Sequence, residues 1–271
     1  RELLQSYVEC RRFDPEDYGR RIAAIFAEGR IVGPGRATTE AAARLIQGVP
    51  WEKAGTPAPS AGNGSAMRAA PIGLFVFDDP KELIRAARDQ GRITHQDERC
   101  SAGAVAIAGA VALALESKTV KVPDFLSQLS RWTAAIEPTV TTGLQQLINW
   151  ISWPPEKAAT VICRFGQDPA SAEEWDGVSP FVTSSVLWSL YSFLRTPDDY
   201  WETICTAIGV GGDVDTTAAM AGAISGAYSG LKAVPLNLAQ RLTDQGTWGF
   251  DEIVALADKA YAVKMRLGHT I

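Results

Sequence analysis

The segment 211–217, which reads Gly-Gly-Asp-Val-Asp-Thr-Thr, places two carboxylates and two hydroxyls directly after two glycines. Oxygen ligands suit a hard cation such as Mg²⁺ or Mn²⁺ far better than Zn²⁺. The glycines free the backbone, and the dipole of a following helix favours carboxylates at its start. Asp213 also fits the role of an ordinary N-cap, but a cap needs only one side chain. The segment therefore predicts a metal site drawn from Asp213, Asp215, Thr216 and Thr217.

A second segment, 62–68, reads Gly-Asn-Gly-Ser-Ala-Met-Arg. Glycines on both sides of Asn63 permit positive φ angles, which turn successive backbone N–H groups towards one point. Such a nest at the start of a helix binds phosphate oxygens. The alternative is an ordinary loop, because Asn-Gly pairs commonly mark turns. Arg68 fits either a contact with an anionic ligand or a structural ion pair.

His95 is one of only two histidines. It follows Thr94, which resembles a helix cap, so we expect His95 in the first turn of a helix, where it can donate to a phosphate or a ribose hydroxyl. The alternative is a structural histidine. His269 lies in the C-terminal tail and is not a candidate. With one such histidine and four dispersed cysteines, neither a zinc site nor a Cys–His nucleophile is supported.

The composition excludes several classes of protein. The 271 residues carry a formal net charge of −5 and form no Lys/Arg-rich run, which argues against binding along a nucleic-acid backbone. The most apolar stretch, 102–115, is short and rich in Ala and Gly, so it predicts a buried helix and no membrane partner. Widely spaced cysteines without a C-x-x-C pair predict reduced thiols in a cytoplasmic protein.

The elements that must position these residues are helices. Helical periodicity and capping signals predict one all-α domain without repeats or linkers. The aromatic side chains of Trp188, Tyr191 and Phe193 are expected in its core. Weak strand signals occur only at 120–122 and 161–165. The predicted helices cover 2–10, 14–29, 39–47, 81–90, 94–116, 124–136, 140–151, 184–194, 196–208 and 251–265.

Taken together, the segments 62–68, 93–95 and 210–222 resemble the ADP-ribosylglycohydrolase family, in order and spacing, from about Phe13 to Ala257. The family includes dinitrogenase reductase-activating glycohydrolases and hydrolases that remove ADP-ribose from arginine or serine. The resemblance implies a compact multi-helix orthogonal bundle with a binuclear Mg²⁺ (or Mn²⁺) centre beside an ADP-ribose cleft. It implies metal ligation by Asp213, Asp215 and Thr216, with Asp215 also catalytic. The substrate-binding residues that it implies are Gly62, Asn63, Gly64, Ser65, His95, Gly211 and Gly212.

One part of the family pattern is missing. Family members carry an earlier acidic segment, with a Glu near a Gly-Asp-Ala-like stretch and then a Thr-Asp-Asp run, which completes the metal centre. No such residues precede Arg1, and Thr38-Thr39-Glu40 does not replace them. Because Arg1 is not a start methionine, we expect 1–271 to be an N-terminally incomplete domain that holds half of the metal site.

The expected activity is metal-dependent hydrolysis that releases ADP-ribose from an ADP-ribosylated protein or a small ADP-ribose conjugate. A non-catalytic ADP-ribose-binding or structural relative of the same fold is the alternative. The acids crowded at 213–215 argue against a purely structural protein. A related hydrolase that acts on another ribosyl compound is a third possibility. The linkage that is cleaved has no readable motif.

Overall fold

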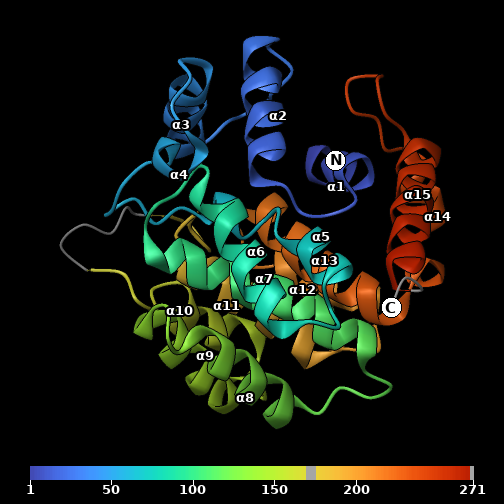
Figure 1. Ribbon diagram of the computed structural model, residues 1–271. Coiled ribbons are helices and arrows are strands. Elements are labelled where there is room, and N and C mark those ends of the chain that lie inside the picture. The colour runs from blue at the N-terminus through green and yellow to red at the C-terminus, as the bar shows by residue number, and fades with distance from the viewer. Residues whose placement is uncertain (169–174, 269–271) are drawn as a thin grey trace.

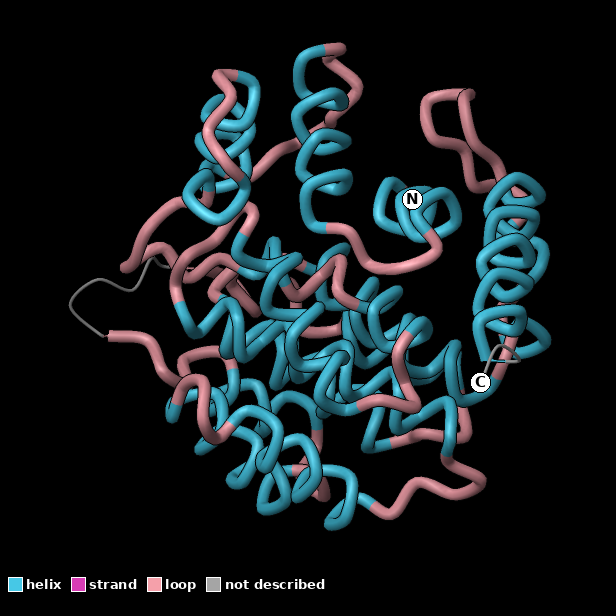
Figure 2. The backbone as a smooth tube through the Cα atoms, viewed as in Figure 1, coloured by secondary structure: helices cyan, strands magenta, loops and turns pink. Residues whose placement is uncertain are grey.

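The computed structural model describes residues 1–168 and 175–268. In this part of the chain, helices are joined by loops and no β-sheet is formed (Figure 2). The helices cross one another at many angles, as an orthogonal bundle requires (Figure 1), and the all-α prediction is confirmed. The α-helices are α1 (Glu2–Cys10), α2 (Pro15–Ala27), α3 (Arg36–Ile46), α4 (Trp51–Ala54), α5 (Ala70–Phe75), α6 (Pro80–Arg92), α7 (Glu98–Glu116), α8 (Val122–Thr133), α9 (Pro138–Trp150), α10 (Pro155–Ile162), α11 (Val182–Arg195), α12 (Tyr200–Ile208), α13 (Val214–Ser229), α14 (Leu236–Ala239) and α15 (Phe250–Gly268), and the 3-10 turns are η1 (Asn63–Ser65) and η2 (Leu231–Ala233).

α7 lies at the centre of the molecule (Figure 1). Its Ala, Gly and Val residues make it apolar on every side, and 14 of its 19 residues are buried. A helix of this kind belongs in a core. Gly73 of α5 lets the two helices approach closely, since a Cβ added to it would lie 2.2 Å from the carbonyl oxygen of Ala108 in α7. α5, α6, α11 and α13 all pack against α7.

α11 is the second core helix, and every residue in it except Arg195 is buried. Trp188, Tyr191 and Phe193 are fully buried, which confirms their predicted place in the core. The rings of Trp188 and Tyr191 stack with centroids 4.9 Å apart. The indole N–H of Trp188 donates to the carbonyl oxygen of Ala207, which ties α11 to the end of α12. α11 therefore forms a fixed base for the residues at its N-terminus.

The first and last helices pack against each other beside the main core. Tyr7 of α1, Phe75 of α5 and Ala260 of α15 form a small separate apolar cluster. The rings of Tyr7 and Phe75 are nearly parallel, with centroids 3.5 Å apart. Figure 1 shows α1 between α2 and α15.

Three local predictions are wrong. Val122 begins α8 and Val161 lies in α10, so neither weak strand signal produces a strand. Short β-branched runs carry a preference that helix packing overrides. α7 begins only at Glu98, with Asp97 as its cap. His95 therefore lies in the connection from α6 to α7 and not in the first turn of a helix. The other histidine, His269, falls outside the described residues.

Among the described helices, only α7 is long and apolar enough to cross a membrane by length and composition. However, 78% of its apolar window is buried inside the protein. Core packing accounts for this apolar character.

Candidate active site

Asp213 occupies the N-cap position of α13, but its side chain makes no capping hydrogen bond. Its Oδ2 instead accepts a hydrogen bond of 2.6 Å from the side-chain amide of Asn63, 150 positions earlier in the chain. An ordinary cap directs its oxygen at the backbone of its own helix. The carboxylate of Asp213 is therefore held for another purpose than capping.

The two glycines before Asp213 place this carboxylate. Gly211 and Gly212 have φ angles of 79° and 87°, as their predicted backbone freedom allows. The N–H of Val178 donates to the carbonyl oxygen of Gly211, and the N–H of Asp213 donates to that of Val178. A Cβ on Gly212 would lie 2.2 Å from the Val178 oxygen. Only glycine allows this close parallel bridge.

A second bridge places Asn63. The N–H of Asn63 donates to the carbonyl oxygen of Pro180, and the N–H of Val182 donates to that of Ala61. Inside this bridge the buried Asn63 side chain donates to Oγ of Ser185, at 2.9 Å, as well as to Asp213. Both N–H bonds of the amide are therefore used, and the amide that holds the Asp213 carboxylate is itself held by Ser185 of α11.

The loop 62–65 does not form the predicted nest. Neither Gly62 nor Gly64 is among the glycines with positive φ, and Asn63–Ser65 forms the 3-10 turn η1. Ser65 is fully buried, and its hydroxyl donates to the carbonyl oxygen of Cys100. Its side chain therefore has a structural role. The local Asn-Gly signal left this alternative open.

His95 lies against the same loop. A bridge joins it to Thr56, and its side chain is only 3% exposed. Added Cβ atoms on Gly62 and Gly64 would lie 3.5 Å and 3.4 Å from its Nε2. Burial, with a smaller contribution from the charge of Arg68, lowers the pKa of His95 to about 3 against the opposing effect of Asp97. The imidazole is therefore neutral at physiological pH.

The three bridges together assemble the predicted site. They connect His95 to Thr56, Gly62 to Phe181 and Gly212 to Val178. The segment 178–182 thus joins the glycine-rich loop to the start of α13. Through this segment Asn63 and Asp213, which lie 150 positions apart in the sequence, are brought together.

The remaining predicted oxygen ligands divide into two groups. Asp215 is exposed on the first turn of α13, and Thr216 is half-buried and hydrogen-bonds to Asp213. Thr217 is fully buried, and its hydroxyl lies within 3.1 Å of the carbonyl oxygen of Asp213. Thr217 thus has a structural role. Asp213, Asp215 and Thr216 are the members of the segment that offer oxygens to a ligand.

The electrostatics of this group favour a cation. Burial raises the pKa of Asp213, hydrogen bonds from Asn63 and Thr216 lower it, and the nearby carboxylate of Asp215 raises it again. In the described part of the chain no Lys, Arg or His side chain forms an ion pair with either carboxylate. Two carboxylates and a hydroxyl fit a hard divalent cation. Within the described residues no third Asp, Glu, His or Cys joins them.

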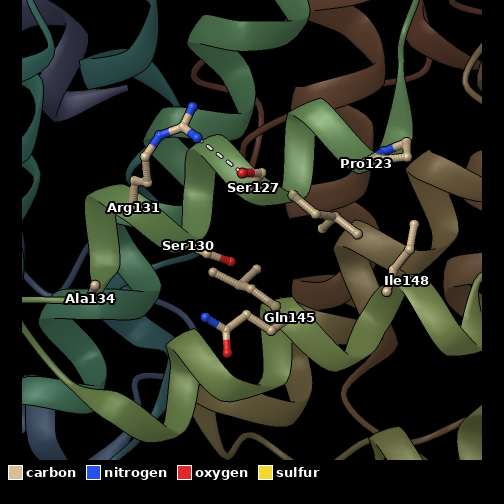
Figure 3. Close-up of a pocket in the computed structure, with 9 residues that line it drawn as sticks. Pro123, Ser127, Ser130, Arg131, Ala134, Gln145 and Ile148 are labelled. Carbon is tan, nitrogen blue, oxygen red and sulfur yellow. Dashed lines mark hydrogen bonds between the residues drawn. The ribbon is translucent and has the colours of Figure 1, made fainter.

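Two hollows on the molecule do not include Asp213, Asp215 or Thr216 among their lining residues. Figure 3 shows the first, between α8 and α9, with Ser130, Gln145 and Ile148 on its walls and a volume of about 430 Å³. The second, of about 600 Å³, is bounded by Gly177 and Val210 and so lies next to the Val178–Gly212 bridge. We therefore define the candidate site by the oxygen ligands of Asp213, Asp215 and Thr216 and not by either of these two hollows.

Sequence reasoning missed three parts of the site. Ser185 holds Asn63, but its signal was only a hydroxyl in an apolar helix. The segment 178–182 carries the bridges, yet it reads as an ordinary connection. The third is the setting of Arg68, whose guanidinium donates to Gln90 and to the hydroxyl of Thr94 and forms no ion pair with another described residue.

Comparisons with known proteins agree with this fold. A family model described as ADP-ribosylglycohydrolase matches residues 1–269. An uncharacterized protein of Archaeoglobus fulgidus is 31% identical over 267 residues, which cover 98% of this chain and 78% of that protein. ADP-ribosylhydrolase ARH3 of Mus musculus is 29% identical over 286 residues, with 97% of this chain and 75% of that protein covered.

A solved structure titled ADP-ribosylglycohydrolase-related protein complex superimposes with a TM-score of 0.71 at 26% sequence identity. The match covers 97% of this chain and 78% of that one. The chain therefore belongs to the ADP-ribosylglycohydrolase family. It is a glycosidic-bond hydrolase, and the roles of its individual site residues stay predictions.

Proposed function

We propose that this protein hydrolyses the glycosidic bond at the distal ribose of an ADP-ribosylated protein or a small ADP-ribose conjugate, and that the reaction depends on Mg²⁺ or Mn²⁺. Family membership supports the reaction class. The observation that supports metal binding is the position of the Asp213 carboxylate. It makes no capping hydrogen bond, has no basic partner among the described residues and is oriented by Asn63.

Asp213, Asp215 and Thr216 are the residues that would hold the cation. When bound, a divalent cation supplies positive charge that orients ribose hydroxyls and lowers the pKa of a bound water. The chain supplies the remaining chemistry. Asn63 keeps one carboxylate oriented, and the exposed Asp215 is free to accept a proton from water as a general base.

We assign diphosphate binding to the loop 62–65. We also assign substrate contact to Gly211 and Gly212, which lie directly before α13. Gly64 lies in the first turn of η1, where backbone N–H groups have no partner inside the turn. Gly64 leaves room for the ring of His95, and Gly62 lies beside the same ring, so a ligand on this loop also meets the imidazole.

The proposal includes a cytoplasmic location and no nucleic-acid partner. Cys10, Cys100, Cys163 and Cys205 are all free thiols, which supports a reducing compartment. The negative net charge supports a small or protein-linked substrate over a polynucleotide.

The metal is tested by thermal unfolding of the wild type, Asp213→Ala and Asp215→Ala, each with excess Mg²⁺ or with chelator. We expect Mg²⁺ to raise the melting temperature of the wild type only, because a ligand that binds the folded state stabilises it by mass action. Asp258→Ala removes an exposed carboxylate from α15 and is the control. If chelator leaves the wild-type melting temperature unchanged, this chain has no working metal site.

The ligand is tested by calorimetry with ADP-ribose and AMP, and the reaction by release of ADP-ribose from arginine-, serine- and acetyl-linked substrates. We expect ADP-ribose to bind more tightly because AMP lacks the diphosphate. Equal affinities would remove the phosphate role from the loop 62–65. Tight binding without turnover on any of the three substrates would favour the non-catalytic relative.

A further inference from the structure

Three polar side chains, those of Gln90, Arg68 and Thr94, form a hydrogen-bonded chain that ends at Nδ1 of His95. Nε of Arg68 donates to Oε1 of Gln90 at 3.0 Å, and Nη2 donates to Oγ1 of Thr94 at 2.7 Å. Oγ1 of Thr94 lies 2.8 Å from Nδ1 of His95. Gln90 and Thr94 are fully buried, so water does not compete for these bonds.

The direction of each bond follows from the groups involved. A guanidinium has donors only, so Thr94 must accept from Arg68. Its own hydroxyl hydrogen then has one acceptor within reach, which is Nδ1 of His95. A neutral imidazole carries a hydrogen on only one nitrogen. With Nδ1 accepting, that hydrogen resides on Nε2.

The Nε2 edge of the ring is the edge that faces the glycine-rich loop. It lies against Gly62 and Gly64, where an added Cβ would be in ordinary contact with Nε2 at Gly62 (3.5 Å) and would collide with Cε1 at Gly64 (2.9 Å). No hydrogen bond from Nε2 to another described residue is formed. The N–H on Nε2 is therefore available to a ligand on this loop.

We infer that Arg68 and Thr94 are positioning residues which fix His95 as a neutral imidazole with its hydrogen on Nε2, so that His95 donates a hydrogen bond to an oxygen of the substrate and does not act as a base. This inference deepens the proposed function, because it assumes that the loop 62–65 binds the ADP-ribose moiety. The network also links three segments, since Gln90 donates to the carbonyl oxygen of Ser65.

The first test is long-range ¹H–¹⁵N NMR of the full chain at pH 7, with His95→Gln used to assign the signals of the two histidines. We expect an unprotonated Nδ1 and a protonated Nε2 in the wild type. A protonated Nδ1, or an imidazolium at pH 7, would overturn the inference whether or not any ligand binds.

The second test compares three threonine variants. Thr94→Val keeps the shape but removes the hydroxyl, so we expect a mixture of tautomers and about tenfold weaker ADP-ribose binding. Thr94→Ser keeps the hydroxyl and should retain both wild-type properties. Thr183→Val is the matched control, because Thr183 is fully buried and its hydroxyl has no partner among the described residues.

The outcomes are separable. A wild-type tautomer in Thr94→Val would show that Thr94 does not position His95, even if binding falls. If the wild type shows the expected tautomer but fails to bind ADP-ribose, the proposed function is contradicted. The inference that His95 is held as an Nε2 donor then still stands. Circular dichroism of Thr94→Val guards against a folding defect, and the wild-type spectrum decides the tautomer without that variant.

Discussion

Asn63 and His95 show how single residues of this site are controlled by neighbours from distant parts of the chain. The amide of Asn63 is held by Ser185 and in turn holds Asp213. The ring of His95 is held by Thr94. Both N–H bonds of the Asn63 amide therefore have acceptors, and Nδ1 of His95 has a donor, as the burial of polar atoms requires. The chemistry at this scale depends on orientation more than on which residue types are present.

The buried His95 predicts a specific pH dependence of stability. Its pKa is about 3 in the folded protein, lowered by burial and by Arg68 and raised by Asp97, against 6.5 in the unfolded chain. Between these values the unfolded state binds one more proton, so stability falls as the pH falls below 6.5. From pH 7 to pH 5 we expect His95 to account for a loss of about 2 kcal/mol.

Urea unfolding of the wild type and His95→Gln at several pH values measures this loss. The difference in free energy of unfolding between the two proteins should shrink by that amount on acidification, while effects of other groups cancel. Two parallel pH profiles would show that His95 titrates normally in the folded protein.

At the scale of elements, the site depends on the start of α13 lying beside the segment 178–182. Gly212 permits this through both its positive φ and the space that a missing Cβ leaves. Gly48 has a similar φ of 84°, but nothing lies within 4 Å of the position that its Cβ would take. Alanine substitutions at the two glycines therefore distinguish the energetic cost of backbone strain alone from the cost of strain together with a steric collision.

Gly48→Ala should cost about 1–2 kcal/mol, the usual penalty for a left-handed residue with a Cβ. Gly212→Ala should cost clearly more and should also abolish the Mg²⁺-dependent rise in melting temperature, because Asp213 must move with the bridge. Urea denaturation gives the first quantity and thermal unfolding the second. Equal costs for the two variants would mean that the bridge is not required.

The sequence predicted the elements better than their junctions, and the reason is physical. Helical periodicity is a local property, so α2, α6, α9 and α11 could be read from it. The Val178–Gly212 and Gly62–Phe181 bridges join residues far apart in the chain and leave no local pattern. The motif at 211–217 was found because it concentrates ligands locally. The role of Ser185 could not be found, because it depends on what packs against α11.

The same limit explains the wrong predictions at 62–64 and at His95. Glycine permits positive φ without requiring it, and tertiary contacts selected a 3-10 turn for Asn63–Ser65. Thr94 resembles a cap in the sequence, yet Asp97 supplies the cap of α7 and Thr94 contacts Arg68. A capping pattern identifies a helix start only to within a few residues.

At the scale of the whole molecule, burial is uneven. α7 and α11 are almost wholly enclosed, whereas the part of α15 whose burial is described, residues 250–267, buries only Leu256 and Ala260. Stability measured locally should follow this difference, since enclosed helices open only when the entire fold opens. α15 has few apolar contacts to lose.

Native-state hydrogen exchange should therefore give α7 amides a free energy of opening equal to that of global unfolding by urea. α11 should match α7, and α15 should exchange through a local opening of lower free energy. Identical protection of α7 and α15 would show that the terminal helices unfold together with the core.

The hydrogen bond between Asn63 and Asp213 also has a consequence in time. Its partners are 150 residues apart, so a growing chain cannot form it until α11 has been made and α13 has followed. Packing of the intervening helices shortens the loop that this bond must close and so lowers its entropic cost. The carboxylate of Asp213 is therefore oriented only late in synthesis, and metal binding there marks a chain in which both α11 and α13 have been made.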